Sequence, residues 1–200
     1  MFKRFILVLA ALTLLALMIG CSKAPEAEMQ SAEAALEAAG VAEAEVYVPD
    51  SYRAAMDTLN AARAGKQEQD SKFALFRSYG KSKEMFVRAE EMFTNAATEA
   101  AAEKERVRLE VTQMLDVAKA VVDSAATALK KAPKGKGSKA DIELITNDLT
   151  AVQSALADAE TDIGSGKFMV AKSKLENVVQ KAHSIMEEIA AAIARKKAGS

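Results

Sequence analysis

The chain has 200 residues, half of them hydrophobic, with 27 Lys and Arg against 28 Asp and Glu and a formal net charge of -1. One Cys and one His exclude a disulfide scaffold and a two-histidine metal site, and the balanced charge argues against a general nucleic-acid binder. An alanine-rich composition with three Pro, nine Gly and no Trp favours packed helices over sheets.

The first residues have the pattern of a secretory signal peptide. Lys3 and Arg4 form a short cationic start, and residues 5–19 are apolar apart from one Thr. This run is too short for a membrane-spanning helix. It ends in the tripeptide Met-Ile-Gly directly before Cys21, the only cysteine of the chain. Residues 1–20 are therefore predicted to be a signal peptide.

The segment that ends at Cys21 resembles the lipobox of bacterial lipoproteins, which has an aliphatic residue three before the cysteine and a small residue directly before it. The resemblance implies cleavage before Cys21, a diacylglyceryl thioether on its sulfur and an acyl group on its new amine. Residues 21–25 would then be a lipidated tether. Ser22 stands where lipoproteins retained in the inner membrane often have Asp, so the resemblance favours the periplasmic face of the outer membrane. The alternative is an uncleaved anchor or a buried free thiol.

The rest of the chain is predicted to be helical. Apolar residues recur at alternating steps of three and four, which places them on one side of a helix in a left-handed bundle. Five segments carry such a stripe, represented by Ala32 and Ala39, Leu59, Phe86 to Ala125, Ile142 to Ile163, and Phe168 to Ala192.

The spacing predicts a helix over residues 67–131, provided that Gly80 does not interrupt it, and a helix end at Gly164. The predicted fold is all-α: an elongated antiparallel bundle of about five helices, in which two three-helix lobes share one long central helix. The N-terminal lobe is placed at residues 26–102 and the C-terminal lobe at residues 103–200.

A weak internal repeat relates the two lobes. Residues 54–62 are similar to residues 151–159, and each copy is followed by a polar turn and a Lys-Phe pair, at residues 72–73 and 167–168. This helix-turn-helix pattern resembles an uncharacterised Ala-rich helical domain common in Gram-negative lipoproteins. That resemblance implies no catalytic residue.

Two groups of residues are candidate sites. A candidate apolar pocket in the N-terminal lobe is formed by Phe73, Phe76, Tyr79, Phe86 and Phe93. The alternative, favoured here, is that these aromatic rings fill space between alanine-faced helices.

The second candidate is a basic tip that would contact an anionic partner. Its eight members lie around residues 130–139 and near the C-terminus, which antiparallel helices would bring together: Lys130, Lys131, Lys134, Lys136, Lys139, Arg195, Lys196 and Lys197. Lysine-rich turns are often merely solvated, and cations near helix C-termini complement the helix dipole, so that interpretation stays open.

No nucleophile has a recognisable base, and the sequence predicts neither an enzyme nor a cofactor or metal. We expect a membrane-anchored, non-catalytic scaffold, spacer or adaptor that contacts peptidoglycan or an envelope protein. The alternative is a periplasmic carrier that holds an apolar small molecule among the N-terminal aromatic residues.

Overall fold

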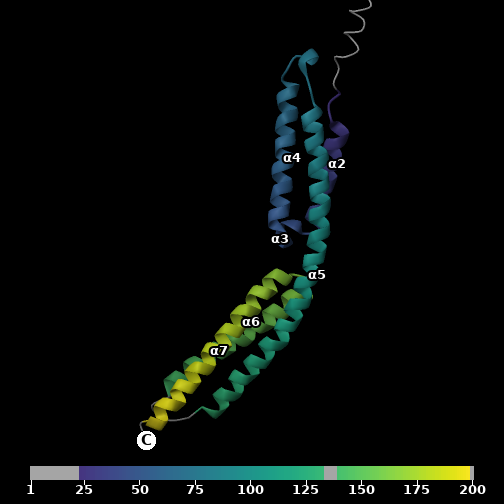
Figure 1. Cartoon of the computed structure of the whole chain (residues 1–200). Helices are drawn as coiled ribbons and strands as arrows, with labels where there is room; N and C mark the ends of the chain where they lie inside the picture. The colour runs from purple at the N-terminus through teal and green to yellow at the C-terminus, as the bar shows by residue number, and fades with distance from the viewer. Residues whose placement is uncertain (1–22, 133–138, 199–200) are drawn as a thin grey trace, which may run out of the picture. The chain divides into compact units, whose positions relative to one another are not determined.

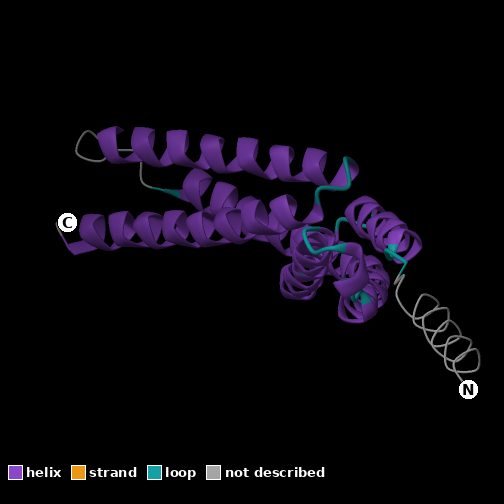
Figure 2. Cartoon of the chain, turned by 90° about the horizontal axis from the view of Figure 1, so that it is seen from above, coloured by secondary structure: helices purple, strands orange, loops and turns teal. Residues whose placement is uncertain are grey.

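The structure is a computed structural model that describes residues 23–132 and 139–198. Throughout these two ranges the regular elements are helices, and no strand occurs (Figure 2). The α-helices are α2 (Glu26–Val41), α3 (Ala44–Tyr47), α4 (Pro49–Asp70), α5 (Gly80–Lys131), α6 (Lys139–Gly164) and α7 (Phe168–Ala198), with a short 3-10 helix η1 (Ala74–Phe76) before α5 (Figure 1). The all-α prediction, with one long central helix, is confirmed.

The chain divides into two compact units between Glu103 and Lys104. Unit 1 contains α2, α3, α4, η1 and the N-terminal part of α5, and unit 2 contains the rest of α5 with α6 and α7. Because α5 is helical through residues 103 and 104, the same helix contributes to both cores.

The prediction of a helix over 67–131 is wrong at its start. Helix α4 ends at Asp70, and residues 71–79 form a connection before α5 begins at Gly80. The Ser71 hydroxyl donates a hydrogen bond to the Glu68 carbonyl at 2.7 Å. This bond competes with the backbone hydrogen bonds that would continue α4. The internal repeat predicts a polar turn before the Lys-Phe pair at residues 72–73, and the structure has a turn at this place.

In unit 1, apolar residues of α2 and α4 are buried in one core with aromatic residues of α5. Ala32 of α2 and Leu59 of α4 are fully buried, as are Phe86 and Phe93 of α5. The ring of Tyr52 meets that of Phe93 edge-on, with 5.7 Å between centroids and 67° between planes. The predicted stripes therefore form the core of this unit.

Helices α4 and α5 approach closely at one point near the connection. An ideal Cβ atom placed on Gly65 of α4 would lie 2.8 Å from Oγ of Ser82, a residue of the first turn of α5. Ser82 is 3% exposed. The missing side chain of Gly65 thus allows the two helices to pack together at this end of unit 1.

In unit 2, α6 and α7 form a hairpin beside the C-terminal part of α5 (Figure 1). The Gly166 N–H donates to the Ile163 carbonyl and the Lys167 N–H to the Asp162 carbonyl, which is the Schellman arrangement at the end of a helix. Gly166 has a φ of +75°, so the left-handed residue is Gly166, two positions after the predicted end at Gly164.

The core of unit 2 largely follows the predicted stripes. Leu175 and Val178 of α7 are buried against α5 and α6, together with Val107 and Val111 of α5. The structure differs at some positions: Val122 is buried in place of the predicted Val121, and Met114 and Leu156 are only half-buried.

Candidate functional site

The predicted lipid-attachment residue, Cys21, lies outside the described residues, as does the predicted signal peptide. The description begins at Lys23, two residues later, and α2 begins at Glu26. Along the chain, Cys21 therefore directly precedes the end of unit 1 at which α2 begins.

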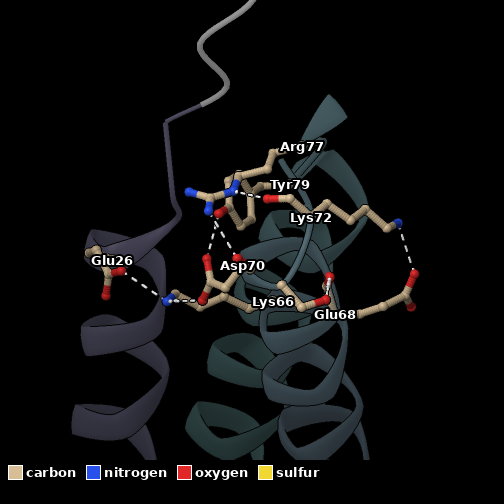
Figure 3. A network of polar contacts seen from close by, with 8 residues as sticks. Glu26, Lys66, Glu68, Asp70, Lys72, Arg77 and Tyr79 are labelled. Carbon is tan, nitrogen blue, oxygen red and sulfur yellow. Dashed lines mark hydrogen bonds and ion pairs between the residues drawn. The ribbon is translucent and has the colours of Figure 1, made fainter. Parts of the chain in front are cut away.

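A polar network ties three helices together at that end of unit 1 (Figure 3). Lys66 Nζ contacts Glu26 Oε1 at 3.0 Å and Asp70 Oδ2 at 3.0 Å. The Tyr79 hydroxyl donates a hydrogen bond to Asp70 Oδ1 at 2.5 Å. Two residues further along α2, Glu28 pairs with Lys83 of α5 at 2.8 Å. The start of α2, the end of α4 and the start of α5 thus lie at the same end of unit 1.

The charges of this network are held in their ionised forms. The hydrogen bond from Tyr79, followed by that from Lys66, lowers the pKa of Asp70, and the same Tyr79 bond raises the pKa of the phenol. Hydrogen bonds to Glu26 and then to Asp70 raise the pKa of Lys66. A general base works best with a pKa near the operating pH, and these shifts move the pKa of each group further from pH 7. The network is suited to holding helices together rather than to proton transfer.

The connection between α4 and α5 is folded against the end of this network. Arg77 donates from Nη2 to the Asp70 carbonyl and from Nε to the Lys72 carbonyl, both at 2.9 Å (Figure 3). The Ser78 N–H donates to Gln69 Oε1 at 3.0 Å. These bonds satisfy backbone groups of the connection and the last carbonyls of α4, so the connection has a defined conformation.

The structure does not bring the five candidate pocket residues together. Phe86 and Phe93 are fully buried in the core of unit 1, and Tyr79 is buried at its end. Phe73 and Phe76 lie on the connection, 70% and 75% exposed, with their ring centroids 6.4 Å apart. The buried rings fill core space, and the exposed ones face away from it, so these positions give the carrier hypothesis no support.

Part of the predicted basic tip is described. Lys130 and Lys131 are exposed in the last turn of α5, and Arg195 is exposed in α7. Lys131 and Ile193 line the same surface hollow, so the C-terminal ends of α5 and α7 are neighbours in unit 2.

The remaining members of the tip fall partly outside the description. Residues 134 and 136 lie outside the described ranges. Lys139 is the first residue of α6, and Lys196 and Lys197 belong to α7, but their side chains are not described. The backbone places the start of α6 and the last turns of α5 and α7 at the same end of unit 2.

Sequence reasoning missed the polar network and a groove between α5 and α7. The groove is lined by Met114, Val117 and Val179, with carboxylates and amides of both helices at its edge. Glu110, one of the lining residues, pairs with Lys172 of α7 at 2.7 Å. Periodicity assigned Met114 to the core, and no local pattern indicates which long-range partners a charged residue meets.

Two further properties concern the described part of the chain. Within it, no group of three or more His, Cys, Asp or Glu side chains is arranged to hold a metal ion. None of its helices is both long enough and apolar enough to cross a membrane. No protein-family model, curated protein or solved structure matches this chain.

Proposed function

We propose that this protein is a lipoprotein anchored through Cys21 to the periplasmic face of the outer membrane, where it acts as a non-catalytic scaffold, spacer or adaptor. The observation that carries the proposal is the lipobox-like segment, which combines a cationic start, a short apolar run and the only cysteine. The first helix that the structure describes begins five residues after that cysteine. Unit 1 would therefore be held close to the bilayer surface.

The attachment expected from such a segment is effectively permanent. One acyl chain holds a protein to a membrane only reversibly, and each buried CH2 group contributes about 0.8 kcal/mol, so three chains together resist release. Removal of Lys3 and Arg4 with the signal peptide leaves the mature chain with a small excess of negative charge. General attraction to anionic lipids is then not the basis of attachment.

The basic tip of unit 2 supplies the second contact in this proposal. Lys130 and Lys131 are exposed beside the end of α7, where Arg195 is exposed as well. Clustered cations attract an anionic polymer, and the stem-peptide carboxylates of peptidoglycan are the periplasmic candidate for such a polymer. An acidic surface of an envelope protein would be recognised by the same chemistry.

Lipidation of Cys21 is tested by growth with labelled palmitate. We expect label in the wild-type protein and none in the Cys21→Ala protein, which should move from the membrane to the soluble fraction. A wild-type protein that takes up no label would refute the anchor.

Contact with peptidoglycan is tested by sedimentation with purified sacculi. Lys134, Lys136, Lys196 and Lys197 are changed together to Gln, and pelleting should fall and become less sensitive to salt. The matched control removes four exposed cations elsewhere in the chain, namely Lys81, Arg88, Lys167 and Lys181. Equal pelleting of both variants and the wild type would exclude a role for the tip and leave cross-linking from the tip to identify a protein partner.

A further inference from the structure

The connection between α4 and α5 presents a cluster of apolar side chains to solvent. Phe73, Leu75 and Phe76 are 70%, 58% and 75% exposed, within four consecutive residues. A single exposed apolar residue is ordinary on a protein surface, whereas a contiguous group of large ones usually marks a contact surface. We call these three residues the apolar turn.

Hydrogen bonds hold the apolar turn in a defined conformation at the surface. The Phe76 N–H donates to the Phe73 carbonyl at 2.8 Å, which closes η1. The side chain of Arg77, the residue that follows the turn, donates hydrogen bonds to the carbonyls of Asp70 and Lys72. The backbone of the turn is therefore tied to the end of α4, and its apolar side chains have no place in the core of unit 1.

The apolar turn lies at the end of unit 1 from which the chain runs back to Cys21. Glu26, the first residue of α2, is linked through Lys66 to Asp70, the last residue of α4, and Tyr79 joins the same carboxylate from the other side of the turn (Figure 3). Since Cys21 is only two residues before Lys23, acyl chains on its sulfur and amine would enter a bilayer beside this end.

We propose that the apolar turn inserts into the interfacial layer of the bilayer that holds the acyl chains of Cys21, and so gives unit 1 a second membrane contact. This inference rests on the proposed lipidation. Phenylalanine and leucine side chains enter the boundary between headgroups and acyl chains when another attachment already holds them there. Lys81, in the first turn of α5, is exposed and would add attraction to anionic headgroups.

The experiment uses the absence of Trp from the chain, which makes a single introduced Trp an unambiguous fluorescent reporter. Phe76→Trp reports on the apolar turn. The matched control is Val41→Trp, because Val41 is 81% exposed and ends α2, about 23 Å along the helix from Glu26. Both lipidated proteins are reconstituted into vesicles of phosphatidylethanolamine and phosphatidylglycerol, with and without brominated acyl chains.

For Phe76→Trp we expect blue-shifted emission in vesicles and about a two-fold loss of emission with brominated lipid, because aromatic side chains settle at that depth. The Val41→Trp protein should show the emission of an exposed indole in both kinds of vesicle. Unshifted and unquenched emission from Phe76→Trp would overturn the proposal and leave a protein partner as the occupant of the turn.

A second measurement separates this inference from the proposed function. Intact mass of each purified protein shows whether Cys21 carries acyl chains. An acylated protein with an unquenched Phe76→Trp signal refutes only the second contact, whereas a protein without acyl chains refutes the anchor and with it the inference.

Discussion

Substitution of Gly65 by Ala tests the close approach of α4 and α5. In the interior of a helix, Ala is more favourable than Gly by about 1 kcal/mol. At Gly65 the new methyl group would lie 2.8 Å from Ser82 Oγ, well inside ordinary contact distance, while Ser82 Cβ would lie at an acceptable 3.9 Å. Because Ser82 is buried, its hydroxyl has little room to move away. We expect Gly65→Ala to lower the free energy of unfolding of unit 1 by about 1 kcal/mol.

The same substitution should change sign when the hydroxyl is removed. In a Ser82→Ala background, Gly65→Ala should raise the free energy of unfolding by about 1 kcal/mol, which gives a coupling of about 2 kcal/mol between the two positions. Gly40→Ala is the control, since no atom lies within 4 Å of an added Cβ there and only a stabilising effect is expected.

The measurement is urea denaturation of the protein, combined with amide hydrogen exchange in α4. Hydrogen exchange assigns the change to unit 1 even where unit 2 unfolds separately. Equal effects of Gly65→Ala in the wild-type and Ser82→Ala backgrounds would refute the steric explanation.

Three other predictions concern separate parts of the chain. Gly166→Ala should cost about 1–2 kcal/mol because its φ is +75°, whereas Gly164→Ala should stabilise α6; urea denaturation checks both, and effects of the same sign would contradict the assigned turn. The lowered pKa of Asp70 contributes stability above its unfolded pKa of about 3.8 that is lost as pH falls through the folded pKa; Tyr79→Phe should reduce this loss between pH 7 and pH 3, and an unaltered pH dependence would show that the hydrogen bond has no such effect. Phe93→Ala should destabilise unit 1 by about 3–5 kcal/mol because the ring is fully buried, and a loss below 1 kcal/mol in denaturation would mean that the ring is not in the core.

Periodicity predicted the core because burial in a helical bundle repeats locally. Ala32, Leu59, Phe93 and Leu175 were assigned from spacing alone, and all four are fully buried. The error at Val121 is a shift of one position, which arises because steps of three and four drift relative to the true period of the helix.

The connection at residues 71–79 could not be placed by the same reasoning. Phe73, Phe76 and Tyr79 are spaced by three and therefore continue an apparent stripe, although only Tyr79 is buried. What ends α4 is a set of side-chain bonds to backbone groups, above all from Arg77, whose partners lie five and seven residues away. A periodicity count contains no information about such bonds.

The candidate sites were predictable only as far as chain order determines them. An antiparallel hairpin returns α7 to the start of α6, so neighbouring ends of α5 and α7 followed from topology. The ion pair between Glu26 and Lys66 joins residues 40 positions apart. The sequence alone does not distinguish Glu26 from several other acidic residues as the partner of Lys66. Selection among them depends on the packing angle of the helices, which no local pattern specifies.

The three-residue link between α6 and α7 also implies an order of assembly. Contacts within this hairpin join residues close in sequence, so little chain entropy is lost when it closes. The ion pair between Glu28 and Lys83 must instead close a loop of more than fifty residues. We expect the C-terminal hairpin to form early on the folding pathway and the helices of unit 1 to dock late.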